Sequence, residues 1–289
     1  MITSPAFRGK RYAVLGLARS GLATVASLVA SGAEVTAWDS SEEARDKAAG
    51  VVLADPLEID LAGFDAIVVS PGVPLNRHPI AAKARDAGVS IIGDVELFAQ
   101  ARANLPAHRV VGITGTNGKS TTTALVHHIL QTAGVPTTMG GNIGLPILAQ
   151  DPLPEGGVYV LELSSYQIDL TFSLDCEVAV LLNVTPDHLD RYESFEAYAA
   201  SKMRLVEMQS GKHLSFTGTE LLASGLARTS DGTAFHTNAI EPIEADRQGE
   251  WPSLAGPHNA QNAAAAILTC IELDIHPPEI ERGLRPCTA

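Results

Sequence analysis

The stretch "GITGTNGKSTT", residues 112–122, brings together glycines, a lysine and several hydroxyl side chains. It follows a short apolar run and precedes "KSTTTALVHHILQTAG", whose apolar residues recur at helical spacing. Between a strand and a helix, backbone N–H groups and the positive end of the helix dipole converge on phosphate oxygens. The strict phosphate-loop pattern G-x-x-x-x-G-K-S/T would need glycine where Ile113 stands, so the match is imperfect. The context still predicts a nucleotide site, in which Lys119 neutralises phosphate charge and Ser120 binds Mg²⁺.

Polar residues follow two later apolar runs, "VYVLEL" (158–163) and "EVAVLLNV" (177–184). Both runs are short and nearly continuous, which is typical of buried parallel strands. Because ligands in open α/β sheets bind outside the carboxyl ends of the strands, four residues are candidates for one site: Glu162, Ser164, Asn183 and His188. Glu162 is placed to supply a carboxylate to Mg²⁺. A glutamate at this position is equally suited to a salt bridge or a helix cap, and a lone histidine is commonly structural.

The order of apolar segments predicts the fold class. Near the N-terminus, "RYAVLG" (11–16), "EVTAWD" (34–39) and "AIVVSPG" (66–72) read as strands separated by helical stretches. Such alternation predicts parallel sheets with helices on both faces. The polar connector "NLPAHR" separates a Rossmann-like domain over residues 1–105 from a P-loop-type ATPase domain, with a mainly parallel sheet, over residues 106–289.

The composition and net charge of the chain limit the kinds of partner that it is expected to bind. The chain of 289 residues has 45% hydrophobic residues and a formal net charge of -13, which argues against broad binding of nucleic acid. Its three cysteines are far apart and form no C-x-x-C pair, so neither a disulfide framework nor a zinc site is indicated. No signal-peptide pattern or long uncharged apolar run stands out. We expect a cytoplasmic monomer that binds neither nucleic acid nor membrane.

The first glycine-rich turn leaves two interpretations open. Its pattern is Gly16, Ala18 and Gly21 rather than G-x-G-x-x-G, and the bulkier second residue hinders close approach of a dinucleotide pyrophosphate. Asp39 nevertheless stands where an acidic residue would contact a ribose hydroxyl, which keeps a nicotinamide-dependent oxidoreductase possible as an alternative. A non-catalytic nucleotide-binding module is the other alternative.

Six motifs, in this order and at these intervals, resemble those of the Mur ligases: "GITGTNGKSTT", "GGNIGLP", "LELSSYQ", "NVTPDHLDRY", "YAASK" and "GPHNAQN". Mur ligases are ATP-dependent enzymes that form amide bonds in peptidoglycan precursor synthesis. The segments "GLARSGLA", "WDSS" and "SPGVP" most resemble the members that add D-glutamate to UDP-N-acetylmuramoyl-L-alanine. A sister ligase that adds another amino acid is the nearest alternative.

The resemblance implies a role for each matching residue. ATP would contact Gly115, Thr116, Asn117, Gly118, Lys119, Ser120, Thr121 and, at the adenine, Asn262. Two Mg²⁺ sites would draw on Ser120, Glu162, His188 and a carbamylated Lys202, and the catalytic residues would be Lys119, His188 and Lys202. The substrate-binding candidates are Arg19, Ser20, Asp39, Ser40, Ser41, Ser70, Pro71 and Gly72 at the UDP group, with Asn142 beside the muramoyl-alanine portion.

The role that the resemblance implies for Lys202 differs from what its position in the sequence predicts. From the sequence chemistry alone, Lys202 is expected to be a solvated residue on a helix face. The family also has a third, C-terminal domain that supplies the D-glutamate site, and the chain stops at "GLRPCTA", before the motif that opens that domain. We therefore expect two of three domains, able to bind the UDP substrate and ATP but ligating D-glutamate poorly.

Overall fold

The computed structural model describes residues 1–289 except 49, 189, 225–236, 245–250, 252, 253 and 286–289. The described chain divides into two compact units. Unit 1 comprises Met1–Leu105 together with Leu145–Pro152 and Asp169–Leu174, and unit 2 comprises Pro106–Gly144, Leu153–Ile168 and Asp175–Ala289. Two short segments beyond residue 105 thus pack with the first unit, although the sequence analysis places them in the second domain.

Unit 1 contains a five-stranded sheet in the order β3-β2-β1-β4-β5, and every pairing between these strands is parallel. The strands are β1 (Arg11–Leu15), β2 (Glu34–Trp38), β3 (Val52–Leu53), β4 (Ala66–Val69) and β5 (Ser90–Ile92). The helices are α1 (Arg19–Ala30), α2 (Glu42–Asp46), α3 (Ile80–Ala87) and α4 (Asp94–Ala101), with 3₁₀ turns η1 (Pro5–Phe7) and η2 (Arg102–Asn104). The chain reverses its direction of travel across the sheet between β1 and β4, which creates a switch point at their carboxyl ends.

The core of unit 1 follows the alternation of side chains along its strands. Ala13 and Leu15 of β1 pack with Ile67 and Val69 of β4 and with Ile80 of α3. These residues lie on one face of the sheet because successive strand residues point to opposite sides. The apolar runs that predicted strands in this region are therefore the central, buried strands of the unit.

Unit 2 contains a six-stranded sheet in the order β11-β10-β9-β6-β8-β7, again with parallel pairings throughout the described strands. Its strands are β6 (His108–Thr114), β7 (Thr137–Gly141), β8 (Gly157–Glu162), β9 (Val178–Leu181), β10 (Leu214–Gly218) and β11 (Thr237–Ile240). Its helices are α5 (Lys119–Thr132), α6 (Ser165–Asp169), α7 (Phe195–Glu207), α8 (Thr219–Ala223), α10 (Pro257–Glu272) and α11 (Pro277–Leu284), and the 3₁₀ turn η3 (Ile147–Ala149) falls in unit 1. The predicted fold class, two parallel-sheet α/β domains, is confirmed.

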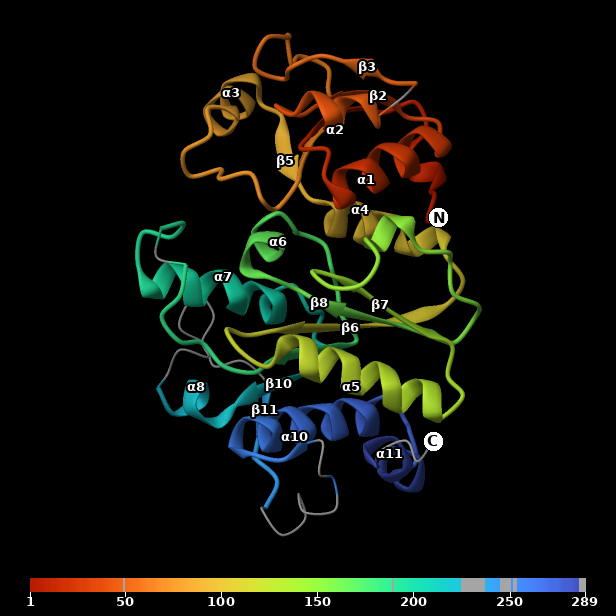
Figure 1. Cartoon of the computed structure of the whole chain (residues 1–289), viewed down its shortest axis with the longest axis vertical. Helices are drawn as coiled ribbons and strands as arrows, with labels where there is room; N and C mark the ends of the chain where they lie inside the picture. The colour runs from red at the N-terminus through yellow and green to blue at the C-terminus, as the bar shows by residue number, and fades with distance from the viewer. Residues whose placement is uncertain (49, 189, 225–236, 245–250, 252–253, 286–289) are drawn as a thin grey trace. The chain divides into compact units, whose positions relative to one another are not determined.

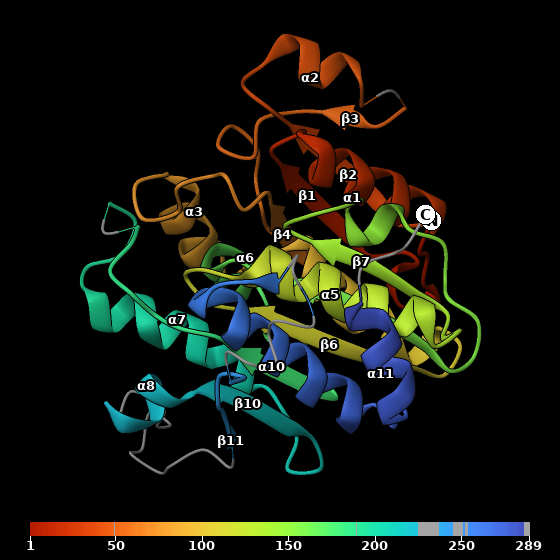
Figure 2. The same cartoon turned by 60° about the horizontal axis from the view of Figure 1, so that its bottom comes forward.

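Helices cover both faces of the second sheet (Figure 1). On one face, α10 and α11 lie beside α5 (Figure 2), and their buried side chains form one apolar cluster with β6, β8 and β9. A run of four buried alanines, Ala263–Ala266, brings α10 close to this cluster. On the other face, Tyr198 and Met203 of α7 pack against Leu181 of β9. The central strand β6 is consequently buried on both sides, and its carboxyl end delivers the chain to residues 115–118.

Candidate functional site

The loop between β6 and α5 ends in a helix start that is open to a ligand. Gly115 has φ 154° and Gly118 has φ 85°, backbone conformations that favour glycine. A Cβ atom on Gly118 would also come within 2.2 Å of Oδ1 of Asn262, so the position has no room for a side chain. Among the described residues, no side chain caps the start of α5. The N–H groups of its first turn have no partner within the helix, and they can bind phosphate oxygens.

Glu162 lies beside this helix start. It is the last residue of β8 and is only 1% exposed. Its Oε2 accepts a hydrogen bond from the Ser120 hydroxyl at 2.7 Å, and its Oε1 accepts one from Nδ2 of Asn142, also at 2.7 Å. The hydroxyl and the carboxylate are both hard oxygen donors, the type that Mg²⁺ prefers. Ser120 and Glu162, predicted from sequence as metal ligands, are thus brought together in a form that fits magnesium.

Lys119 is folded back over the loop. Its Nζ donates to the carbonyl oxygens of Gly115 at 3.0 Å and Thr116 at 2.9 Å. Burial lowers the pKa of Lys119, whereas the negative charges of Glu162 and Asp187 act in the opposite direction. The Nζ of Lys119 lies at the loop, where it can exchange its carbonyl partners for phosphate oxygens.

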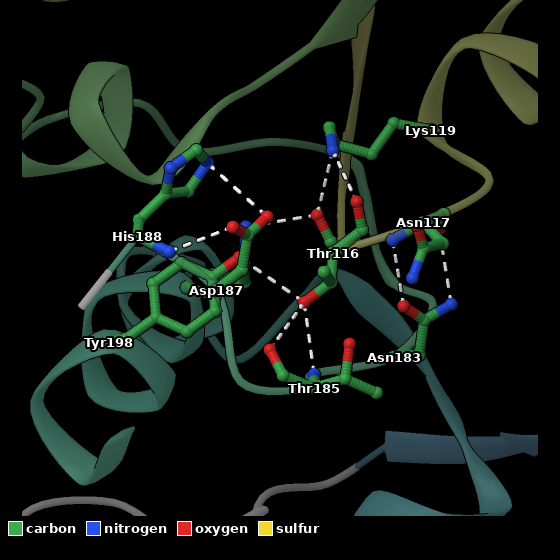
Figure 3. Close-up of polar contacts among 10 residues, drawn as sticks. Thr116, Asn117, Lys119, Asn183, Thr185, Asp187, His188 and Tyr198 are labelled. Carbon is green, nitrogen blue, oxygen red and sulfur yellow. Dashed lines mark hydrogen bonds and ion pairs between the residues drawn. The ribbon is translucent and has the colours of Figure 1, made fainter. Parts of the chain in front are cut away.

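Residues that follow β9 contact the same loop (Figure 3). Oδ1 of Asn183 accepts the Asn117 backbone N–H at 2.9 Å, and Nδ2 of Asn183 donates to the Asn117 carbonyl at 3.1 Å. The Thr116 hydroxyl accepts the backbone N–H of Thr185 at 3.0 Å and lies 3.2 Å from the Tyr198 hydroxyl. Thr116 and Asn117, which the sequence assigns to ATP, therefore also bond to other parts of the protein.

His188 lies among aromatic rings at the end of this segment. It has a positive φ of 55°, and its backbone N–H donates to Oδ1 of Asp187 at 2.8 Å. Its imidazole centre is 5.1 Å from the ring of Tyr166 and 5.9 Å from that of Tyr198. Neither tyrosine was predicted from the sequence as a site residue, although "SSYQ" and "YAASK" contain them. Within the described part of the chain, no three His, Cys, Asp or Glu side chains gather as a metal cluster, so any second metal site here would also need ligands of other kinds.

Lys202 is buried, at 2% exposed, and not solvated as the sequence chemistry alone suggests. It lies on the inner face of α7, where its Nζ donates to the carbonyl of Gly115 at 2.9 Å. The same nitrogen lies 4.7 Å from the centre of the Tyr198 ring, within the range of a cation–π contact. Lys202 is buried because its side of α7 faces Gly115, and the helical pattern in the sequence does not show which neighbour a helix face contacts.

Asn262 reaches the loop from α10. It is 4% exposed, and its Nδ2 donates to Oδ1 of Asn259 at 3.2 Å. Its Oδ1 faces Gly118, as the close approach to an added Cβ shows. The neighbouring Gln261 donates through Nε2 to the Leu182 carbonyl at 3.1 Å, which attaches the start of α10 to the end of β9. The structure thus brings Asn262 to Gly118, directly before Lys119 and Ser120 in the first turn of α5.

The candidates for the UDP group lie in unit 1 at the carboxyl ends of its strands: Arg19, Ser20, Asp39, Ser40, Ser41, Ser70, Pro71 and Gly72. The Ser70 hydroxyl donates to the Gly16 carbonyl at 2.9 Å across the switch point. Oδ2 of Asp39 accepts the Leu17 N–H at 2.7 Å, and its Oδ1 accepts the Ser41 N–H at 2.9 Å. Each carboxylate oxygen of Asp39 thus accepts one backbone N–H, which fixes the side chain at the end of β2.

Comparison with known protein families identifies the family to which the chain belongs. Residues 113–220 match the Mur ligase middle domain, and residues 10–93 match the family described as Mur ligase MurD-like, N-terminal domain. With the relatives described next, these matches show that the chain belongs to the Mur ligase family. No helix among the described residues has the length and apolar character needed to cross a membrane.

Within the family, the chain is similar to UDP-N-acetylmuramoylalanine–D-glutamate ligases. It is 62% identical to that of Sphingopyxis alaskensis over 286 residues, which cover 98% of this chain and 66% of the relative. The identity is 63% over 279 residues with the Novosphingobium aromaticivorans enzyme (95% and 63% covered) and 55% over 298 residues with the Zymomonas mobilis enzyme (98% and 68% covered). The chain thus spans about two thirds of the length of these relatives.

Solved structures share the fold at much lower identity. The UDP-N-acetylmuramate:L-alanyl-gamma-D-glutamyl-meso-diaminopimelate ligase of Neisseria meningitides is 20% identical, with a TM-score of 0.63 and coverage of 96% of this chain and 98% of that one. The UDP-N-acetylmuramate-alanine ligase of Thermotoga maritima is also 20% identical, with a TM-score of 0.54 and coverage of 96% and 68%. These similarities support the two-domain α/β architecture.

Proposed function

We propose that this chain supplies the ATP site and the UDP-substrate site of a ligase that joins D-glutamate to UDP-N-acetylmuramoyl-L-alanine. The observation that carries the proposal is the meeting of Ser120 and Glu162 at the open start of α5. That arrangement suits a nucleotide triphosphate with its magnesium ion. The names of the relatives support the choice of substrate and amino acid.

The chemistry requires an activated carboxyl group, because a carboxylate oxygen is a poor leaving group when an amine attacks. Transfer of the γ-phosphoryl group from ATP to the substrate carboxylate breaks one P–O bond and forms another. The resulting acyl phosphate is attacked by the amine of D-glutamate, an amide bond forms and phosphate leaves. Such a reaction depends on positioning and charge stabilisation more than on covalent help from side chains.

Each group at the helix start has a task in this scheme. The N–H groups at the first turn of α5 would bind phosphate oxygens, and the Lys119 ammonium would move from the Gly115 and Thr116 carbonyls to the transferred phosphoryl group. Ser120 and Glu162 would hold Mg²⁺, which offsets phosphate charge when bound. His188 and a carbamylated Lys202 would hold a second Mg²⁺, and Asn262 would contact the adenine.

The UDP group would bind at the switch point of unit 1. Its candidates there include the open start of α1, where no side chain of the described residues caps the helix, and the adjacent Ser70. Asn142 already orients Glu162 and would also meet the muramoyl-alanine portion of the substrate. Neither the contact with the UDP group nor the contact with the muramoyl-alanine portion requires a dinucleotide such as NADH.

The test is isothermal titration of this chain with UDP-N-acetylmuramoyl-L-alanine, with UDP, MgADP and NADH as comparison ligands. We expect saturable binding of the muramoyl nucleotide, UDP and MgADP, and weaker binding of the muramoyl nucleotide after Ser70→Ala. Binding of NADH without a response to either uridine ligand would overturn the proposal in favour of an oxidoreductase.

A further inference from the structure

Asn183 makes two hydrogen bonds to the backbone of a single residue in the phosphate-binding loop. Its side-chain Oδ1 accepts the N–H of Asn117 at 2.9 Å, while its Nδ2 donates to the carbonyl of the same residue at 3.1 Å (Figure 3). The Asn183 carbonyl also accepts the N–H of Thr116 at 2.9 Å. Three hydrogen bonds thus connect one asparagine to two consecutive loop residues.

These contacts continue the sheet beyond its last paired residues. β6 and β9 are in parallel register up to Thr114 and Leu181, and the N–H of Leu182 donates to the Thr114 carbonyl at 3.0 Å. After this point the loop turns away at Gly115, which has φ 154°. The Asn183 amide takes the place that a neighbouring strand backbone would occupy, since it offers one acceptor and one donor side by side.

The bonded residues come directly before the helix start. Asn117 precedes Gly118, where an added Cβ would lie 2.2 Å from Oδ1 of Asn262, and Lys119 begins α5. Fixing both polar groups of Asn117 therefore fixes the direction in which the chain enters Gly118 and the first turn. The N–H groups that would bind phosphate belong to that turn.

A second contact extends the arrangement toward His188. The Thr116 hydroxyl accepts the Thr185 N–H at 3.0 Å and donates to the Thr185 carbonyl at 3.2 Å. Asn183 and Thr185 are on the same short segment, which leads to Asp187 and His188. The loop and this segment are therefore held together at two successive loop residues, Thr116 and Asn117.

We propose that Asn183 is a positioning residue: its amide holds Asn117 so that the loop binds nucleotide without first reorganising. The proposal rests on the nucleotide site of the proposed function. In the absence of the amide, the loop would sample other conformations, and binding would have to order it. Loss of the two hydrogen bonds should therefore weaken nucleotide binding roughly tenfold.

The test compares the unsubstituted chain with Asn183→Ala by isothermal titration with MgADP and with UDP. We expect Asn183→Ala to bind MgADP about tenfold more weakly and UDP unchanged, because the UDP candidates lie in the other unit. Asn238→Ala is the matched control, since Asn238 is an exposed residue of β11. General loss of structure would not separate the two ligands in this way.

Amide hydrogen exchange provides a direct readout of the contact. The Asn117 N–H should exchange faster in Asn183→Ala and stay protected in Asn183→Asp, which keeps an acceptor oxygen. Equal MgADP affinity and equal exchange in the unsubstituted chain and Asn183→Ala would overturn the positioning role and leave the proposed function intact. Failure of the unsubstituted chain to bind MgADP would overturn the proposed function itself.

Discussion

The Ser120 hydroxyl donates a 2.7 Å hydrogen bond to Oε2 of Glu162, which joins the first turn of α5 to the carboxyl end of β8. The other carboxylate oxygen is occupied by the Asn142 amide. A carboxylate that is 1% exposed is costly to keep charged unless donors or cations surround it. Under the proposed function, this pair would form part of a cation site that a nucleotide and its magnesium ion complete.

Replacing Glu162 should remove the magnesium dependence of nucleotide binding. Glu162→Gln keeps the shape and an acceptor for Ser120 but carries no charge, so Mg²⁺ should bind about tenfold or more weakly. Titration with ADP in the presence and absence of Mg²⁺ measures this effect. Glu207→Gln, at an exposed position late in α7, is the matched control. An unchanged benefit from Mg²⁺ in Glu162→Gln would show that the metal is held elsewhere.

A methyl group on Gly118 should damage the site more than the backbone strain alone explains. Gly118 and Gly134 have similar positive φ values, 85° and 76°, so alanine at either position should cost about 1–2 kcal/mol in unfolding free energy. Gly118→Ala would in addition place Cβ 2.2 Å from Oδ1 of Asn262, whereas no described atom lies within 4 Å of a Cβ on Gly134. We expect Gly118→Ala to be the less stable variant and to lose MgADP binding, which Gly134→Ala retains. Comparable urea unfolding and MgADP titration curves for the two variants would contradict this.

The sequence predicted the central strands of both sheets because these are continuous apolar runs. β1, β4 and β9 fall within segments identified in this way, and β6 and β8 overlap such segments but begin one or two residues earlier. Some edges were harder: β7, with sequence "TTMGG", has no apolar run to mark it, and β3 has only two residues. An edge strand is paired on one side only, so fewer of its side chains need to be apolar.

Part of the candidate site could also be predicted, because some of its residues lie in patterns that are visible in the sequence. Ser120 and Glu162 follow from a loop motif and a strand end, both visible in the sequence. The burial of Lys202 and the contacts of Tyr198 could not be predicted, because they depend on which side of α7 packs against Gly115 and Thr116. Such tertiary contacts join residues more than eighty positions apart and leave no local pattern.

Lys202 should react with carbon dioxide in the folded chain. Its nitrogen is 2.9 Å from the Gly115 carbonyl, next to the loop where the second metal is proposed, and a carbamate there would supply an anionic ligand in place of a cation. Nuclear magnetic resonance with ¹³C-bicarbonate should show a carbamate signal that Lys202→Arg lacks, since a guanidinium does not form this adduct. Signals of equal strength from both proteins would mean that the carbamate is formed on another amine.

Asp94 should make the stability of the chain depend on pH. Asp94 is 4% exposed at the start of α4, and burial raises the pKa of its carboxyl group from 3.8 to about 6, against the opposing effect of the hydrogen bond from the Val95 N–H. The folded state thus holds the proton more tightly than the unfolded state. This contribution to stability is fully present below about pH 4 and is lost as the pH rises through about 6. Asp94→Asn cannot ionise and keeps an acceptor for Val95, so it should be more stable than the unsubstituted chain at pH 7.5, by on the order of 2–3 kcal/mol. Thermal unfolding of both proteins at pH 4.5 and pH 7.5 measures this difference in stability. If the stability of Asp94→Asn relative to the unsubstituted chain is the same at both pH values, Asp94 ionises without penalty.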